Sequence, residues 1–267
     1  MKRGMVWGKQ VRLGRITENG RMLCVPMDHG VSSGPVKGLE DIHGMFYTLE
    51  KAGVTAVLAH KGVFRTLPRP LKVGTIMHMS ASTSLSSRPN LKVQVATVEQ
   101  AVKLGVDAIS VHVNIGGEDD PDMLVKLGMV ADECDEWQIP FIAMMYPRGS
   151  NIKNPQDVEA ISHVARVGAE LGADMVKTPM PSADPSEVAR VTRRCPVPVV
   201  AAGGPKMERD EDILKLAWAS IKGGCVGITF GRNIFQHRNP EAIVKALREI
   251  VLNGKTPEEV VATGILG

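Results

Sequence analysis

The sequence is poor in cysteine, with four in 267 residues. Cys24, Cys134, Cys195 and Cys225 lie far apart and include no Cys-x-x-Cys pair. This spacing argues against a disulfide framework and against a zinc knuckle. We therefore expect four buried free thiols in a protein of a reducing compartment.

Long apolar runs and a dominant charge are also missing. No apolar run is long enough to span a bilayer, and residues 1–20 have basic residues without the apolar segment of a signal peptide. The net charge is +3 with 23% charged residues, which gives neither a nucleic-acid footprint nor an acidic tail. We expect a soluble, cytoplasmic protein without a nucleic-acid or membrane partner. The slight positive excess suits an anionic small molecule.

Eight short runs rich in Val, Ile, Ala and Met recur along the chain without alternating polar residues, as is typical of parallel strands covered on both faces. The predicted strands are Met22–Met27, Val54–His60, Val73–Met79, Asp107–Val113, Phe141–Tyr146, Asp174–Thr178, Val197–Ala202 and Val226–Phe230. Segments of helical period lie between most of them, at Gly38–Ala52, Val98–Leu104, Pro121–Trp137, Pro155–Leu171, Pro185–Arg194, Asp210–Lys222 and Pro240–Leu252.

A glycine joins a helical segment to the next strand at Lys51–Val54, Leu104–Asp107 and Leu171–Asp174, which indicates repeated βα units. Eight such units predict a single-domain (β/α)8 TIM barrel of the α/β class over residues 1–267. Residues 1–20 are expected to cover its bottom, and residues 255–267 to form a terminal helix. The alternative is a doubly wound open sheet, but no GxGxxG follows the first strand.

The third unit is the least regular, because a polar, serine-rich stretch without a clear helical pattern follows Met79. We expect a long loop there. Whether Ala81–Ser87 acts as a lid is left open by the sequence.

The strand Asp174–Thr178 carries one lysine near its far end. Met175 and Lys177 share a face, because side chains alternate along a strand. Burial disfavours an ammonium, and the neutral amine that remains can attack a carbonyl. A lysine at a strand end can equally extend into solvent, so its neighbours decide between the two interpretations.

Polar residues gather where the predicted strands end, and in a (β/α)8 barrel these ends form the active site. Lys177, Tyr146 and Asp28 fall at three such ends. An amine, a phenol and a carboxylate suffice for imine chemistry on a carbonyl, as nucleophile, proton donor and base. Each also has a structural interpretation, as an ion-pair partner, a rim aromatic or a turn cap. Their convergence favours a site.

Two glycine turns follow the seventh and eighth strands, where such barrels commonly hold phosphate. Gly203 and Gly204 form the first, and Gly231 with Arg232 forms the second. Bare backbone N–H groups and an arginine favour an anion. Tight turns also need glycine, but two of them at these positions predict a phosphate site.

Four histidines also fall at strand ends, one each on the first four: His29, His60, His78 and His112. One interpretation is that they coordinate a divalent metal, as in a metal-dependent aldolase or hydrolase. They include no closely spaced pair and no fixed carboxylate partner, so we expect hydrogen-bonding residues of the pocket wall, with no metal and no cofactor. The other histidines, expected at the surface or in packing, are His43, His163 and His237.

Five motifs resemble the archaeal-type class I aldolase family, in the same order and over roughly residues 14–252. They are Met27–Ser32, Met144–Gly149, Val176–Thr178, Ala202–Lys206 and Gly231–Gln236. The resemblance implies a Schiff-base lysine at Lys177, a proton donor at Tyr146 and a proton acceptor at Asp28. It further implies substrate contacts at His29, Gly30, Val31, Ser32, Pro147 and Arg148, and phosphate contacts at Gly203, Gly204, Gly231 and Arg232.

The family contains several activities on phosphorylated ketoses and aldehydes, often in homo-oligomers. The pattern is closest to transaldolases that pass part of a ketose phosphate to L-aspartate semialdehyde, early in aromatic amino-acid biosynthesis. Fructose-1,6-bisphosphate aldolases share the motifs but tend to carry an aromatic residue at the position of Met144. Enzymes joining dihydroxyacetone phosphate to aspartate semialdehyde remain open, as does a non-catalytic sugar-phosphate-binding barrel. Thiolases of the family fit less well, because they are expected to lack Tyr146.

Overall fold

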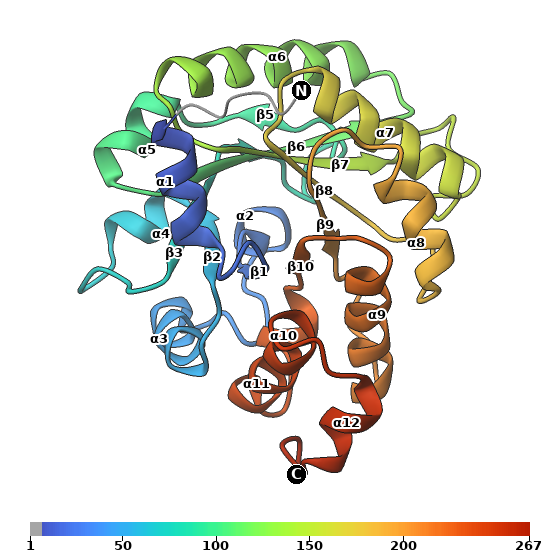
Figure 1. Cartoon of the computed structure of the whole chain (residues 1–267). Coiled ribbons are helices and arrows are strands. Elements are labelled where there is room, and N and C mark those ends of the chain that lie inside the picture. The colour runs from blue at the N-terminus through green and yellow to red at the C-terminus, as the bar shows by residue number, and fades with distance from the viewer. Residues whose placement is uncertain (1–6) are drawn as a thin grey trace.

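The computed structural model describes residues 7–267, and a closed barrel of eight parallel strands lies at its centre (Figure 1). The barrel strands are β1 (Met22–Pro26), β2 (Ala56–His60), β3 (Gly74–His78), β6 (Ala108–Ile115), β7 (Phe141–Pro147), β8 (Met175–Thr178), β9 (Val199–Ala202) and β10 (Gly227–Thr229). They follow one another in sequence order, and β10 closes the ring by pairing with β1, Met22 opposite Gly227. The predicted (β/α)8 barrel is confirmed, and closure rules out the open sheet.

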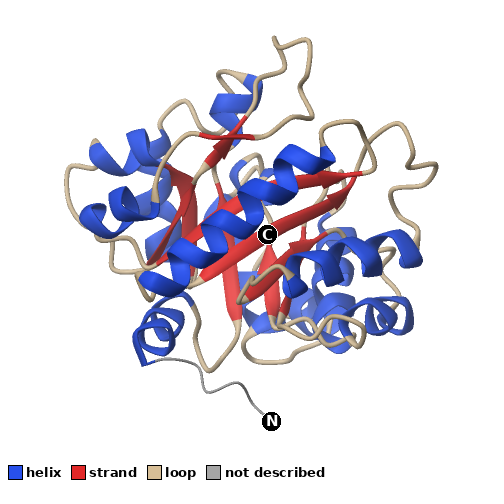
Figure 2. Cartoon of the chain, turned by 90° about the horizontal axis from the view of Figure 1, so that it is seen from above, coloured by secondary structure: helices blue, strands red, loops and turns tan. Residues whose placement is uncertain are grey.

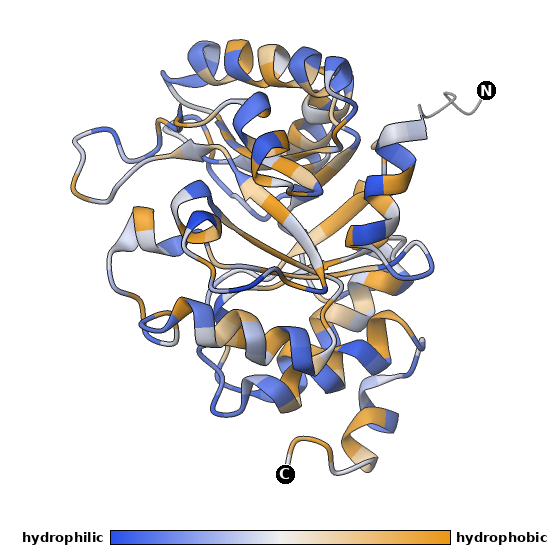
Figure 3. Cartoon of the chain, turned by 90° about the vertical axis from the view of Figure 1, so that its left-hand side faces the viewer, coloured by the Kyte–Doolittle hydropathy of each residue, from blue (hydrophilic) through white to orange (hydrophobic). Residues whose placement is uncertain are grey.

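Helices lie outside the strands (Figure 2). The longer ones are α3 (Ile42–Ala52), α5 (Val98–Leu104), α6 (Asp120–Glu136), α7 (Val158–Glu170), α8 (Pro185–Thr192), α9 (Asp210–Lys222) and α11 (Pro240–Val251). Two of the predicted glycine stops, Gly53 and Gly105, have left-handed φ angles of 89° and 74°, which suits a residue without Cβ. Most of these helices have an apolar and a polar side (Figure 3), as expected for helices packed on a barrel. None of the described helices is both long and apolar enough to cross a bilayer.

The barrel interior is apolar below its upper rim. Met22, Ile76, Ile142 and Met175 belong to one buried cluster inside it. Lys177 follows Met175 on the same face of β8, as the alternation predicted, and only 6% of its surface is exposed. Because the barrel interior below Lys177 is apolar, this side chain can reach water only through the opening at the carboxyl ends of the strands.

The other end of the barrel is covered by α1 (Trp7–Ile16). The buried Lys9 donates to Asp174 Oδ2 at 2.7 Å, just before β8. Arg15 reaches Asp107, just before β6, at 3.3 Å. These contacts bring α1 to the amino ends of the strands and leave the carboxyl ends for a ligand. Residues 1–6 of the expected cover lie outside the described residues.

Several short elements had no counterpart in the predictions. A two-stranded antiparallel ribbon follows the third strand, where only a loop was expected. It consists of β4 (Ser80–Ala81) and β5 (Val93–Gln94). The short helices without a counterpart are α2 (His29–Ser33), α4 (Lys61–Arg65) and α10 (Arg232–Phe235), whereas α12 (Pro257–Ala262) corresponds to the expected terminal helix. Elements of two to six residues are too short to show a hydrophobic period. The terminal helix is shorter than expected, and its start is fixed by a capping box between Thr256 and Glu259.

Candidate active site

A pocket of about 950 Å³ opens at the carboxyl ends of the strands, a size typical of sites for small ligands. The structure brings Asp28, Tyr146 and Lys177 together in its wall, from β1, β7 and β8. The order of strands makes this possible, because β7 and β8 are neighbours and the barrel brings β1 round to face them.

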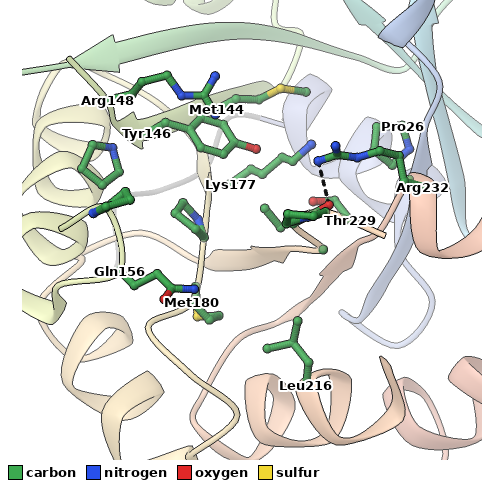
Figure 4. A pocket seen from close by; sticks show the side chains of 18 of the residues that line it. Pro26, Met144, Tyr146, Arg148, Gln156, Lys177, Met180, Leu216, Thr229 and Arg232 are labelled. Atoms are coloured by element: carbon green, nitrogen blue, oxygen red, sulfur yellow. Dashed lines mark hydrogen bonds between the residues drawn. The ribbon is translucent and has the colours of Figure 1, made fainter. Parts of the chain in front are cut away.

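Lys177 lies at the centre of this arrangement. Strand register sets it opposite Met144 on β7 and Val200 on β9. In the view of Figure 4, the Lys177 side chain runs past the Tyr146 hydroxyl, and its amine points toward Arg232. The phenol from the neighbouring strand β7 is therefore placed beside the Lys177 side chain, where it can exchange a proton with a substrate bound to the amine.

The ring of Tyr146 is held from the neighbouring strand. It stacks on His112, with ring centroids 4.6 Å apart and planes 25° from parallel. The His112 Nε2 atom in turn lies 2.8 Å from Asn114 Oδ1. Burial, together with the charge of Lys92, keeps the pKa of His112 well below its usual value. The neutral imidazole therefore serves as a fixed platform for the phenol.

Asp28 precedes α2, but within residues 7–267 its carboxylate accepts no helix-capping hydrogen bond. It lies between two histidines, 3.7 Å from His29 Nδ1 and 3.8 Å from His78 Nε2. Burial alone would raise the pKa of Asp28, but its electrostatic interactions with His78, His29 and Lys177 lower it below the usual range. Asp28 is therefore ionised at neutral pH, as a general base must be.

His78 is buried beside Asp28. Its Nδ1 atom lies 2.8 Å from Ser110 Oγ and its Nε2 atom 3.3 Å from Ser80 Oγ. Burial lowers the pKa of His78 to about 3, so the ring is neutral over the ordinary pH range. Burial also lowers the pKa of His60, which packs edge-on against His78 at 5.2 Å. Nowhere in residues 7–267 do three His, Cys, Asp or Glu side chains gather so that they can hold a metal ion.

Because His78 is neutral in the folded protein, we expect the free energy of unfolding to depend on pH. Between about pH 6.5, the usual histidine pKa in an unfolded chain, and about pH 3, the unfolded state binds a proton at residue 78 that the folded state does not. Stability therefore falls with decreasing pH, by about 1.4 kcal/mol per pH unit for this proton. We expect His78→Asn to flatten the slope of unfolding free energy between about pH 6 and about pH 5, measured by urea denaturation. An unchanged slope would contradict a neutral His78.

The two glycine turns meet at the ends of β9 and β10. Arg232 donates from Nη2 to the Gly204 carbonyl at 2.9 Å, and Asn233 donates to the Gly203 carbonyl at 2.8 Å. Gly204 has a φ of +67° and open space around it. At Gly231, a Cβ would lie 2.9 Å from Pro26 O. The hydrogen bonds from Arg232 and Asn233 thus join the two turns into one edge of the pocket.

The Nε atom of Arg232 is buried and has no hydrogen-bond partner within the described chain. A buried cationic donor without a partner is costly. An anion at this edge would relieve that cost.

The remaining predicted substrate contacts divide into two groups. His29, Ser32, Pro147 and Arg148 line the pocket, whereas Gly30 and Val31 lie in α2 outside its lining. Of the histidines expected in the pocket wall, His29 and His112 line it, whereas His60 and His78 lie behind Asp28. Lining residues that the sequence did not single out include Lys92, Gln156, Met180 and Lys215. No motif marks them, because only the fold brings their loops and helices to the mouth.

All four cysteines are buried and free, as expected. Burial raises the pKa of Cys24 to about 12, so this thiol inside the barrel stays protonated. His163 is exposed, and His237 lies 2.9 Å from Asp210 outside the pocket lining.

A closed (β/α)8 barrel with a buried lysine at the end of one strand and a tyrosine beside it on the neighbouring strand has the arrangement of the class I, Schiff-base-forming aldolases. The chain belongs to the DeoC/LacD family of aldolases, whose family model matches residues 22–237. The resemblance to class I aldolases seen in the sequence is thereby confirmed.

Three known proteins illustrate the similarity. The 2-amino-3,7-dideoxy-D-threo-hept-6-ulosonate synthase 1 of Archaeoglobus fulgidus is 41% identical, over 95% of this chain and 94% of that protein. The 2-amino-4,5-dihydroxy-6-oxo-7-(phosphonooxy)heptanoate synthase of Streptomyces griseus is 35% identical, over 94% of this chain and 92% of that protein. A solved Schiff-base-forming fructose-1,6-bisphosphate aldolase superposes with a TM-score of 0.85 at 27% identity, covering 90% of this chain and 98% of that one.

Proposed function

We propose that the protein is a transaldolase that transfers a fragment of a phosphorylated ketose to L-aspartate semialdehyde. The product would be 2-amino-3,7-dideoxy-D-threo-hept-6-ulosonate, a precursor of aromatic amino acids. The observation that carries the proposal is 41% identity, over nearly the whole chain, to the Archaeoglobus enzyme of that name. The reaction also suits the buried amine of Lys177.

The proposed reaction begins when the amine of Lys177 attacks the ketose carbonyl to give a carbinolamine. Tyr146 donates the proton that lets water leave, and an imine remains. Asp28 accepts the proton of the hydroxyl next to the bond that breaks, so an aldehyde that carries the phosphate departs and the enamine of the unphosphorylated fragment stays on Lys177. The enamine attacks the aldehyde carbon of L-aspartate semialdehyde, the new alkoxide takes up a proton, and water hydrolyses the imine to release product.

The charge of the pocket supports phosphorylated substrates. Its wall has five Lys or Arg side chains against two carboxylates. We assign phosphate binding to the backbone amides of Gly203, Gly204 and Gly231 and to Arg232. The partnerless Nε of Arg232 supports this assignment. Assembly into a homo-oligomer and a cytoplasmic location remain predictions.

Two alternatives have specific support. A class I fructose-1,6-bisphosphate aldolase is supported by the structural similarity, and condensation of dihydroxyacetone phosphate with aspartate semialdehyde by the Streptomyces relative. Met144 favours the transaldolase, because fructose-1,6-bisphosphate aldolases of the family tend to carry an aromatic residue at this position. Met144 is buried in the pocket wall directly opposite Lys177 in the β7–β8 register, so its size and polarity bear on the imine.

A product assay separates these functions. We expect the purified protein to consume aspartate semialdehyde together with a ketose phosphate, and to cleave fructose 1,6-bisphosphate alone at least about tenfold more slowly, which is about 1.4 kcal/mol of transition-state discrimination. Activity should survive EDTA, since no step uses a metal. Rapid cleavage of the bisphosphate without aspartate semialdehyde would overturn the transaldolase assignment, and loss of activity on chelation would favour a metal-dependent aldolase.

A further inference from the structure

Two cationic side chains stand near one another on one side of the pocket, and the proposed reaction leaves them without a role. Lys92 precedes β5 and donates to Ser82 Oγ. Arg148 follows β7, and its guanidinium lies 5.6 Å from the ring centroid of Tyr146. Burial lowers the pKa of Lys92, and the positive charge of Arg148 lowers it further. Among the described residues, no carboxylate forms an ion pair with either side chain.

The backbone at Lys92 is anchored to the barrel. Lys126 of α6 is buried, and its ammonium donates both to the Lys92 carbonyl and, at 3.1 Å, to the His112 carbonyl on β6. Ser82, the hydroxyl partner of Lys92, donates to the Pro89 carbonyl at 2.7 Å. Lys92 is thus a half-buried cation held in place before any ligand arrives, which lowers the cost of binding one.

The barrel order sets this pair across the mouth from the glycine turns. Around the ring, β8 lies midway between β10 and β6. Arg232 follows β10, Lys177 lies on β8, and the Lys92 backbone is tied to β6. A seven-carbon chain that begins at the turns and has its carbonyl at Lys177 would extend its far end toward Lys92 and Arg148.

The chemistry of that far end follows from the products of the two relatives. Both names describe seven-carbon chains with a carboxylate at carbon 1, an amino group at carbon 2 and a carbonyl at carbon 6. They differ at carbon 7, which carries a phosphate in one product and none in the other. The carboxylate, on the acceptor half, is therefore the anion that the two products share.

We propose that Lys92 and Arg148 form a second anion subsite, which binds the carboxylate of the acceptor aldehyde. This rests on the proposed function. A planar guanidinium matches the two oxygens of a carboxylate, and the lysine adds a point charge. Mutual repulsion between the cations is relieved when an anion lies between them. The pair thus selects an acceptor with an anionic end and orients its aldehyde toward the enamine on Lys177.

The test is Lys92→Met, which removes the charged terminal group and keeps an unbranched side chain of similar length. We expect kcat/KM for L-aspartate semialdehyde to fall about 10- to 100-fold, as for loss of a charged hydrogen bond. The acceptor 3-aminopropanal, which lacks only the carboxylate, should react equally well with wild type and variant. Borohydride trapping of hydroxyacetone, the three-carbon fragment that becomes carbons 5 to 7 of the proposed product, should also stay unchanged, because this fragment ends short of the acceptor site at Lys92. Lys92→Arg should restore most of the preference for the carboxylate.

Lys61→Met is the matched control. Lys61 also holds the ribbon segment, donating to the Val95 carbonyl at 2.5 Å, but it does not line the pocket. Equal losses in Lys61→Met and Lys92→Met, or equal losses with both acceptors, would overturn the proposal in favour of a structural role for Lys92. A larger loss with glyceraldehyde 3-phosphate than with L-aspartate semialdehyde would overturn the carboxylate assignment in favour of a phosphate. If the wild-type protein does not react with L-aspartate semialdehyde, the proposed function is wrong as well. If the wild-type protein reacts and Lys92→Met has the same kcat/KM, only the proposed subsite is wrong.

Discussion

Lys177→Met is expected to abolish the borohydride-stable adduct with a ketose phosphate and to lower turnover by about four orders of magnitude or more. The imine cannot form without the amine, and no other amine can replace it at this position, on the strand opposite Met144 and Val200. Methionine fills a similar volume, and the apolar plug below the site tolerates it. The fold should therefore survive the change.

The measurement combines trapping with peptide mapping by mass spectrometry. In wild type, the reduced adduct should map to the peptide that contains Lys177, and in the variant it should vanish. Lys103→Met is a suitable control, because Lys103 is a lysine on the outer surface, 72% exposed and paired with Glu99. A variant at residue 177 that retains wild-type turnover would leave only a sugar-phosphate-binding barrel.

The barrel was predictable because its βα units repeat a similar local sequence pattern along the chain. Buried runs such as Phe141–Tyr146 and helix-ending glycines such as Gly105 are local features, visible without knowledge of the fold. The ribbon of β4 and β5 was not, because its strands have only two residues each and its stability depends on packing against β6. Short, partly exposed segments carry no periodic signal.

The site was predictable only as far as it lies on the strands. Lys177, Tyr146 and Asp28 sit at strand ends, and the rule for (β/α)8 barrels converts that position into proximity. Lys92 could not be found in this way, because it reaches the pocket from a loop that is held by Lys126 of a distant helix. The neutral state of the histidines was also out of reach, since it comes from burial by residues remote in sequence.

Tyr146→Phe is the second large effect, a fall in kcat of about 10²- to 10⁴-fold, the usual range for loss of a general acid. Phenylalanine keeps the ring that stacks on His112, so the pocket should retain its shape and donor binding should change little. Only the hydroxyl, which lies beside the Lys177 side chain in Figure 4, is lost. Dehydration of the carbinolamine then lacks its proton donor.

Trapping separates this defect from that of Lys177→Met. Because the amine of Lys177 remains, Tyr146→Phe should still give the borohydride adduct, but slowly, when borohydride is added at increasing times after the donor. The chain offers one other tyrosine as a control, Tyr47 on α3, whose ring lies beneath Arg69 and away from the pocket lining. Tyr47→Phe should leave turnover within a factor of about two, because it removes no group from the barrel mouth. If Tyr146→Phe traps the donor as fast as wild type, Tyr146 is not the group that donates the proton.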